Sequence, residues 1–311
     1  MKSKTFPLTA ADGTPIYIYQ WLPDTKKEIK GAIQISHGMA EHAARYERFA
    51  VELVKAGYAV YANDHRGHGK TAGSLDKVGY FADEQGWEKV VEDQFTITRH
   101  IKKEHPGLPV FLFGHSMGSF VSRNYVMQHG NELKGLILSG TAGDPGLLGK
   151  IGYLVAKREA KKVGRKTRSP FLDKLSFGKF NSAFKPNRTA FDWLSRDNAE
   201  VDKYVDDPWC GEVFTAGFFC DLLPALTYIN KAENINRIPK NLPIYLFSGA
   251  LDPVGANTKG VLQVYGSFLK AGIMDVSYKF YPEGRHEMLN EINRDEVFRD
   301  VIAWLDKHRE S

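Results

Sequence analysis

One serine held between two glycines, in the stretch LPVFLFGHSMGSFV at residues 108–121, constrains the fold of this chain most. The apolar run just before the glycines is short and rich in β-formers, which is typical of a buried strand in a parallel sheet. After them, apolar residues interleave with polar ones and indicate an amphipathic helix that stops near Gly130. Glycines on both sides permit a very tight backbone turn. The stretch therefore predicts a strand, a sharp turn and a helix, with Ser116 exposed at the apex.

Other β-like runs indicate that this strand belongs to a larger sheet, and eight runs are recognised in all: 6–10, 15–21, 31–36, 58–63, 109–113, 135–139, 243–248 and 276–281. The first two flank Asp12-Gly13 and predict a hairpin, which makes them the antiparallel edge of the sheet. Helical patterns separate most of the later runs, at 44–56, 87–105, 116–129, 257–271 and 293–308. This alternation predicts an α/β fold with a mostly parallel eight-stranded sheet and helices on both faces.

The alternation stops over residues 141–236 and then resumes. This segment is rich in aromatic and charged residues and contains no convincing strand. The simplest interpretation is one core, formed by residues 1–140 and 237–311, that carries residues 141–236 as a helical lid inserted late in the core.

Composition sets limits on the class of protein. With 42% hydrophobic and 25% charged residues, the chain of 311 residues is typical of a globular protein with a substantial core. Cys210 and Cys220 are too few for a disulfide framework and favour a reducing compartment. No apolar signal segment or run of membrane-spanning length is evident, so a cytoplasmic location is expected.

The positive charge of the chain is local. Residues 150–168 contain eight Lys or Arg and one Glu, so the remainder of a chain with net charge +5 is slightly acidic. In the same region Leu147, Leu148, Ile151, Leu154 and Val155 recur at helical spacing among lysines. This pattern is typical of a basic amphipathic helix that contacts an anionic membrane or micelle surface, and equally of the solvated face of an ordinary lid helix. No nucleic-acid partner is expected.

A serine hydroxyl becomes a useful nucleophile only when a base takes its proton and a third group orients that base. In such sheets, functional side chains gather at the C-terminal ends of the strands. Asp252 follows the run 243–248, and His286 follows the run 276–281. We therefore interpret Ser116 as the nucleophile, His286 as the base and Asp252 as the orienting acid.

The negative charge that develops in such a reaction needs two backbone N–H donors. One is expected from Met117, directly after the serine, and the other from Met39, because Gly38 lets the backbone approach closely. The tempting metal ligands in this region are the histidines of HGMAEH and DHRGHG, at positions 37, 42, 65 and 68. Their spacing does not match a known ligand run, so a structural loop is favoured and no metal or cofactor is expected.

Five motifs in this order, HGMAEH, DHRGHGKTAGS, GHSMGS, GALDPV and EGRHEMLNE, resemble the monoacylglycerol lipase and lysophospholipase branch of the α/β hydrolases. The resemblance implies an α/β-hydrolase fold and the same three catalytic residues and two oxyanion donors. The segment AFDWLSRD also resembles bacterial members. One departure is Ser119, where many relatives have a third glycine.

The resemblance implies a serine esterase that acts on single-chain lipid esters, with monoacylglycerol as the first substrate hypothesis. A lysophospholipase or a general carboxylesterase is the alternative, and an aminopeptidase-type amide hydrolase is the second. A haloperoxidase or a catalytically idle binding protein would share the fold. The candidate substrate-pocket residues are His115, Phe184, Trp209 and Phe218; the aromatic residues among them fit an acyl tunnel or the lid's own core.

Overall fold

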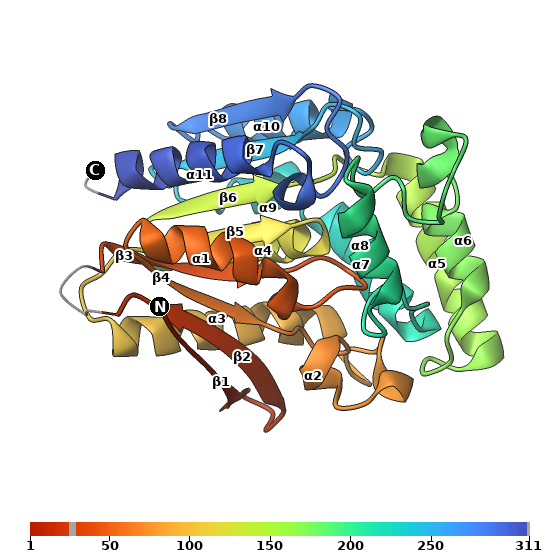
Figure 1. The fold of residues 1–311 in the computed structure, drawn as a ribbon. Helices are drawn as coiled ribbons and strands as arrows, with labels where there is room; N and C mark the ends of the chain where they lie inside the picture. The colour runs from red at the N-terminus through yellow and green to blue at the C-terminus, as the bar shows by residue number, and fades with distance from the viewer. Residues whose placement is uncertain (25–28, 310–311) are drawn as a thin grey trace.

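The computed structural model describes residues 1–24 and 29–309, and it is built around one eight-stranded sheet (Figure 1). The order across the sheet is β1-β2-β4-β3-β5-β6-β7-β8. The strands are β1 (Lys2–Thr9), β2 (Pro15–Leu22), β3 (Gly31–Ser36), β4 (Tyr58–Asn63), β5 (Val110–His115), β6 (Gly135–Ser139), β7 (Ile244–Gly249) and β8 (Val276–Tyr281). The expected fold of eight strands, mostly parallel, is confirmed.

The antiparallel edge is also confirmed. β1 pairs with β2 from Lys2 opposite Leu22 to Thr9 opposite Pro15, across the Asp12-Gly13 turn, and β2 runs antiparallel to β4. All other neighbouring strands are parallel. The central strands β3, β4, β5 and β6 are buried along their whole length, because helices cover both faces.

The helices divide between the two faces of the sheet (Figure 1). The buried side chains of α1 (Glu47–Lys55) and α11 (Arg294–His308) form one hydrophobic cluster with one face. Those of α3 (Gly86–Glu104), α4 (Met117–His129) and α10 (Lys259–Lys270) form a second cluster on the other face. Outside the later insertion, the remaining short helices of the described residues are α2 (Gly69–Ala72) and the 3-10 turns η2 (Ala43–Tyr46), η3 (Leu75–Lys77), η4 (Gly130–Glu132) and η6 (Met288–Asn290).

Between β6 and β7 the chain leaves the sheet, over residues 140–243, and we call this stretch the inserted segment. It forms α5 (Gly146–Val163), α6 (Pro170–Phe177), η5 (Phe180–Phe184), α7 (Asn198–Asp206), α8 (Ala216–Tyr228) and α9 (Ala232–Ile235). Local signals start two of these helices: the Ser169 side chain accepts from the Leu172 N–H, and the Thr215 side chain accepts from the Phe218 N–H. Buried residues of α8 join the core cluster of α3 and α4.

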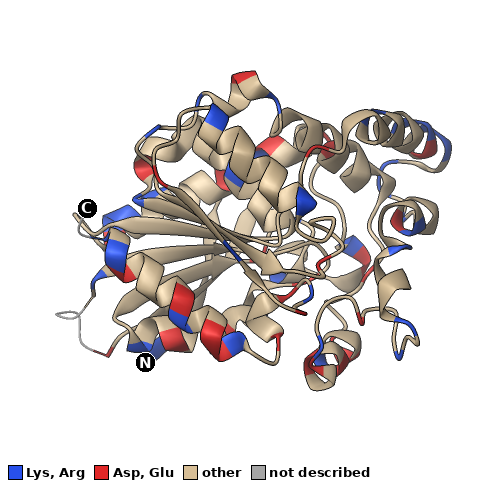
Figure 2. Cartoon of the chain, turned by 90° about the horizontal axis from the view of Figure 1, so that it is seen from above, with Lys and Arg blue, Asp and Glu red and all other residues tan. Residues whose placement is uncertain are grey.

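The inserted segment covers the end of the sheet at which the parallel strands terminate (Figure 1). Blue Lys and Arg positions gather on its outer helices in Figure 2, in agreement with the basic composition of residues 150–168. Within the described residues, none of the helices combines the length and the apolar character needed to cross a bilayer.

Candidate active site

Ser116 lies in the sharp turn between β5 and α4, and this part of the sequence prediction is confirmed. Its backbone has φ +51° and ψ −120°, a conformation that non-glycine residues rarely adopt. The flanking structure holds it there, because the Ser116 N–H donates to the Ser139 carbonyl at 2.9 Å. A side chain at Gly118 would place its Cβ 2.0 Å from the Ser36 carbonyl oxygen, so only glycine lets α4 approach β3 this closely.

Ser119, at the position where many relatives have a third glycine, forms a local hydrogen bond. Its hydroxyl donates to the Ser116 carbonyl oxygen at 2.6 Å and is buried. This bond supports the first turn of α4 directly beneath the nucleophile candidate. The departure from the motif therefore leaves the turn intact.

Asp252 and His286 meet after the ends of β7 and β8. His286 Nδ1 lies 3.0 Å from both carboxylate oxygens of Asp252, and both side chains are buried. The Asp252 carboxylate also accepts from the Val254 N–H at 2.9 Å, which orients it. A Cβ at Gly140 would lie 2.9 Å from His286 Cε1, so a glycine leaves room for the imidazole. The structure thus places an acid behind the histidine, as a base of this kind requires.

The charges around His286 adjust its pKa in the direction that a proton acceptor requires. Burial lowers the pKa of His286, but the Asp252 carboxylate outweighs burial, so that pKa is raised above its ordinary value. The neighbouring His115, whose ring centroid lies 4.7 Å from that of His286, behaves in the opposite way. Burial and the nearby His286 lower the pKa of His115 to about 3, so it is neutral at physiological pH.

The two expected oxyanion donors lie beside Ser116. Met39, Met117 and Ser116 line the same cavity, and a Cβ at Gly38 would come 3.2 Å from Ser116 Cβ. Within residues 1–24 and 29–309, neither the Met39 N–H nor the Met117 N–H has a protein acceptor. Both donors are therefore available to a ligand. The Gly38 N–H, by contrast, donates to Glu41 Oε1 at 2.6 Å, which fixes the loop.

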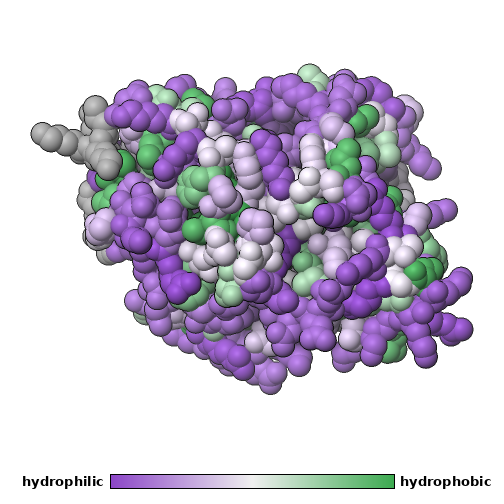
Figure 3. Space-filling view, turned by 90° about the horizontal axis from the view of Figure 1, so that it is seen from below, coloured by the Kyte–Doolittle hydropathy of each residue, from purple (hydrophilic) through white to green (hydrophobic). Residues whose placement is uncertain are grey.

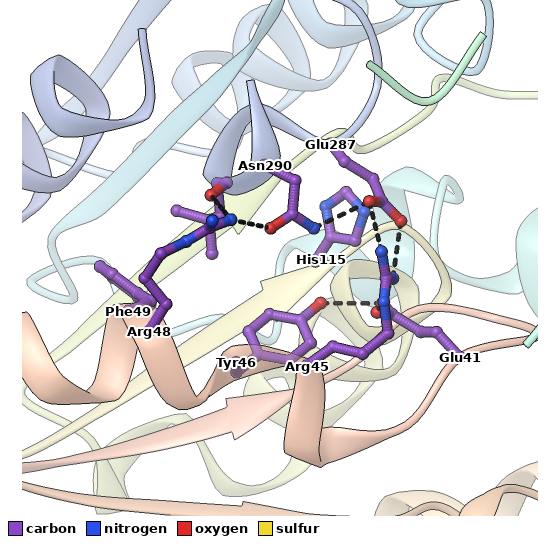
Figure 4. Close-up of a pocket in the computed structure, with 9 residues that line it drawn as sticks. Glu41, Arg45, Tyr46, Arg48, Phe49, His115, Glu287 and Asn290 are labelled. Atoms are coloured by element: carbon purple, nitrogen blue, oxygen red, sulfur yellow. Dashed lines mark hydrogen bonds and ion pairs between the residues drawn. The ribbon is translucent and has the colours of Figure 1, made fainter. Parts of the chain in front are cut away.

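A buried ionic cluster connects this loop to the histidine loop (Figure 4). Arg45 Nη1 and Nη2 donate to the two carboxylate oxygens of Glu287 at 2.8 and 2.7 Å, and Arg45 Nη1 also donates to Glu41 at 2.6 Å. Burial acts to raise the pKa of Glu287, but the Arg45 guanidinium overcomes it and holds that pKa at about 2. Because Glu287 follows His286 and Glu41 binds Gly38, Arg45 joins the two halves of the site.

Ser116 and His286 open onto one cavity of about 950 Å³ beneath the inserted segment. Glu41, His115 and Glu287 contribute polar groups from the core, and the inserted segment contributes others, from Asp173, Ser176, Lys179, Asn181 and Glu212. Much of the remaining wall is apolar and comes from α4, α5, α6, η5 and α8 together with the loop before α7; it includes Phe120, Leu148, Ile151, Val155, Phe177, Phe180, Phe191, Trp193, Leu222, Leu223 and Leu226.

Only one of the four pocket candidates from the sequence, His115, lines this cavity. Phe218 is fully buried at the first turn of α8, where it packs against Phe81 with ring centroids 4.8 Å apart, so only later turns of α8 reach the cavity. Phe184 lies against the Arg285 guanidinium at 4.3 Å, and Trp209 packs against the core. The choice of these three aromatic residues was wrong, because aromatic composition does not say which face of an element meets the cavity.

The sequence reasoning also missed wall residues. Leu148, Ile151 and Val155 were expected either to contact a lipid surface or to form the solvated face of a lid helix; they line the cavity, although Leu148 and Ile151 are also 80% and 48% exposed. The signal was present, because these three residues recur at helical spacing on one face of α5. What the pattern does not reveal is that this exposed face borders the cavity, to which α8, lying beside α5, also contributes (Figure 1).

The histidines of the glycine-rich loops have structural partners. His37 Nε2 accepts from the His65 N–H at 3.0 Å, and His68 Nδ1 lies 2.9 Å from the Arg66 carbonyl oxygen. A different group, His42, Asp207 and Cys210, brings three potential ligand atoms within 4.8 Å of one another. His42 Nε2 lies 2.8 Å from the Asp207 carboxylate, so a hydrogen bond between the loop and the inserted segment already accounts for this contact.

The serine turn follows β5, the acid follows β7 and the histidine follows β8, all at one end of a mostly parallel sheet. This arrangement is that of an α/β hydrolase, as the sequence motifs implied. A family model described as serine aminopeptidase, S33, matches residues 27–293. The chain belongs to that family.

Individual relatives agree with this assignment. The monoglyceride lipase of Homo sapiens is 29% identical over 307 residues, which cover 96% of this chain and 89% of the human protein. The monoacylglycerol lipase of Mycolicibacterium smegmatis is 29% identical over 301 residues, covering 95% of this chain and 94% of that enzyme. The crystal structure of a highly thermostable carboxyl esterase from Bacillus coagulans, in complex with glycerol, has a TM-score of 0.91 at 29% identity and covers 99% of both chains.

Proposed function

We propose that this protein hydrolyses carboxylic esters of single-chain lipids, foremost monoacylglycerol, to a fatty acid and an alcohol. The observation that carries the proposal is the cavity onto which Ser116 and His286 both open, whose wall combines a large apolar surface with a smaller set of polar and charged groups. An ester with a polar alcohol part and an apolar acyl part matches this combination. Its volume of about 950 Å³ lies within the range of about 300–1,000 Å³ for ligand sites.

The reaction proceeds through an acyl-enzyme. His286 takes the proton of the Ser116 hydroxyl as the serine oxygen attacks the ester carbonyl, and Asp252 stabilises the imidazolium that forms. The N–H groups of Met39 and Met117 donate to the oxyanion of the tetrahedral intermediate. His286 then protonates the leaving alcohol, and a water molecule, activated by the same histidine, releases the fatty acid.

The relatives favour ester hydrolysis over amide hydrolysis as the activity of this protein. The human and mycobacterial relatives are named for monoglyceride and monoacylglycerol hydrolysis, although the family description refers to a serine aminopeptidase. An aminopeptidase needs free carboxylates to hold the substrate ammonium. Asp206, Asp207 and Asp221 of the inserted segment do not line the cavity. Four other carboxylates do, and three of them already pair with arginines: Glu41 and Glu287 with Arg45, and Glu212 with Arg168. Asp173 is the fourth.

The inserted segment serves as the lid of the core in this proposal, and part of it contacts the substrate-bearing surface. Leu147 and Leu154 on α5 are 71% and 65% exposed and lie among four lysines of the same helix, at positions 150, 157, 161 and 162. Viewed from below, hydrophobic patches adjoin hydrophilic ones at the right-hand end of the molecule, where Figure 1 shows α5 and α6 (Figure 3). We propose that this face rests on an anionic membrane or micelle surface, with the enzyme acting in the cytoplasm.

Hydrolysis rates across monoacylglycerols of increasing acyl length test the proposal, with 4-nitrophenyl acetate as a short soluble ester and an amino-acid anilide as the peptidase substrate. We expect rates that peak at medium or long chains. Rates confined to the shortest esters would replace the lipid assignment with that of a general esterase. Turnover of the anilide alone would favour the aminopeptidase alternative.

A further inference from the structure

Arg123, on α4, is a large charged side chain that the fold buries completely, at 0% exposure. Within the described residues no carboxylate forms an ion pair with it, and the charge that acts on it most comes from the exposed Asp144. Burial lowers the pKa of Arg123 to about 9, which still leaves it charged at neutral pH. A buried cation without a counter-ion is costly, so the groups that it contacts instead explain its placement.

All the acceptors of Arg123 belong to the inserted segment. Nη1 donates to the Ala142 carbonyl oxygen at 2.8 Å, while Nη2 donates to the Ile229 carbonyl oxygen at 3.2 Å and to Asn230 Oδ1 at 2.6 Å. Ala142 comes three residues after the end of β6, where the segment leaves the core. Ile229 and Asn230 directly follow α8 (Ala216–Tyr228), where the chain continues through α9 on its way back to β7. One guanidinium therefore binds the start of the inserted segment and the end of α8, and we call these two places the roots of the segment.

The contact between Arg123 and the Ile229 carbonyl oxygen has a further physical basis. Ile229 is the C-cap residue of α8, and its carbonyl is one of those that a helix end leaves without an intrahelical partner. A cation at a helix C-terminus is favoured by the helix dipole. Asn230 strengthens this end by donating from Nδ2 to the Leu226 carbonyl oxygen at 2.8 Å.

The same helix begins directly after Ser116. α4 begins at Met117, the oxyanion-donor candidate, continues through Phe120 on the cavity wall, and places Arg123 one turn later. The residues that flank its two anchor points form other parts of the wall. Ala142 and Pro145 line the cavity at the start of the segment, and Leu222, Leu223 and Leu226 line it on α8.

We propose that Arg123 is a positioning residue that clamps both roots of the inserted segment to the helix following Ser116, and so determines which acyl chain lengths the cavity accepts. The acyl-chain part rests on the proposed lipid esterase function; the clamp itself does not. Short esters occupy only the space beside Ser116, so their hydrolysis does not depend on the position of the more distant cavity walls. Long acyl chains need α5 and α8 at the correct distance from the serine.

The test compares Arg123→Met with the wild type on 4-nitrophenyl esters from acetate to palmitate. We expect kcat/KM for the acetate to change by less than about threefold, while kcat/KM for the longest esters falls by about tenfold or more as their walls shift. Arg123→Lys should recover part of the loss, because lysine retains the positive charge but lacks the two separate Nη donors of the guanidinium. Arg99→Met, at an exposed arginine on α3, is the matched control and should change neither rate.

Asn230→Ala removes only one of the three acceptors of Arg123, the Asn230 side-chain oxygen. This variant replaces Arg123→Met in the experiment if Arg123→Met does not fold. Hydrogen exchange measured by mass spectrometry on peptides covering residues 142–146 and 226–231 gives a readout independent of substrate. We expect exchange there to accelerate by about tenfold in either variant, with the sheet unchanged. Equal loss of activity on every ester, or unchanged exchange at both roots, would overturn the clamp. A wild type inactive on long esters would refute the lipid function, while the exchange experiment would still decide on the clamp.

Discussion

Ser116 has an unfavourable backbone conformation because the elements around it require it. β5 ends and α4 begins on either side of a single residue with φ +51°, and the Ser119 hydroxyl secures the carbonyl of that residue. Strain of this kind persists where the surrounding structure determines it. At the scale of single residues, the site therefore consists of a strained serine, an acid-bound histidine and two free N–H groups.

Removing the nucleophile is the first test at this scale. For Ser116→Ala we expect kcat to fall by about 10⁴- to 10⁶-fold, as for loss of other catalytic serines, because no other group can form the acyl-enzyme. A fluorophosphonate probe should label the wild type and not the variant. Ser267→Ala, on α10, is the control and should keep full labelling. An active Ser116→Ala enzyme would refute the proposed mechanism.

The pH dependence follows from His286. The base must be neutral to take a proton, so kcat/KM should rise with pH through the pKa of His286, which Asp252 holds above the ordinary value of about 6.5. In Asp252→Asn the stabilising charge is lost, so the midpoint of the pH profile should move to lower pH while kcat falls by about 10⁴-fold. A midpoint that stays in place in the variant would show that Asp252 does not act on His286.

At the scale of elements, the site depends on how closely α4 approaches β3. Gly118 allows that approach, since a Cβ there would come 2.0 Å from the Ser36 carbonyl oxygen. Backbone atoms cannot move as the end of a flexible side chain can. The packing of one helix against one strand thus determines where the Met117 N–H points.

Two glycine substitutions separate this packing from helix propensity. Gly118→Ala should destabilise the protein by about 1–3 kcal/mol through overpacking, and lower activity as well. Gly266→Ala, in α10 where a Cβ would meet nothing within 4 Å, should stabilise it by about 0.5–1 kcal/mol. Denaturant unfolding measures both. Equal effects of the two changes would contradict the role assigned to the α4–β3 contact.

At the scale of the whole molecule, charge and hydrophobicity are unevenly distributed. The core supplies the reaction centre, whereas the inserted segment supplies the cavity walls and an outer face that is both basic and apolar. Such a face binds anionic lipid through apolar burial and electrostatic attraction together.

Vesicle sedimentation tests this arrangement. The double change Leu147→Glu and Leu154→Glu should reduce binding to vesicles containing anionic phosphatidylglycerol by about tenfold, through lost apolar burial and added negative charge. Neither residue lines the cavity, so hydrolysis of 4-nitrophenyl acetate should remain unchanged. Met274→Glu, at a residue that is 74% exposed near the start of β8, is the control and should bind as the wild type does. Binding that is equal for neutral and anionic vesicles would refute the electrostatic contribution.

The local pattern of the chain was enough to determine the strands, most helices, the hairpin edge and the turn at Ser116, because each depends on residues close together in sequence. It also indicated Asp252 and His286, since parallel strands all end at one edge of the sheet. The cavity walls were decided only by the tertiary structure. Phe218 is buried in the core while Leu148 borders the cavity, and Arg123 binds the Ile229 carbonyl, more than a hundred residues away in the sequence. Such contacts depend on how α5 and α8 pack on α4, and periodicity along one helix carries no information about its neighbour.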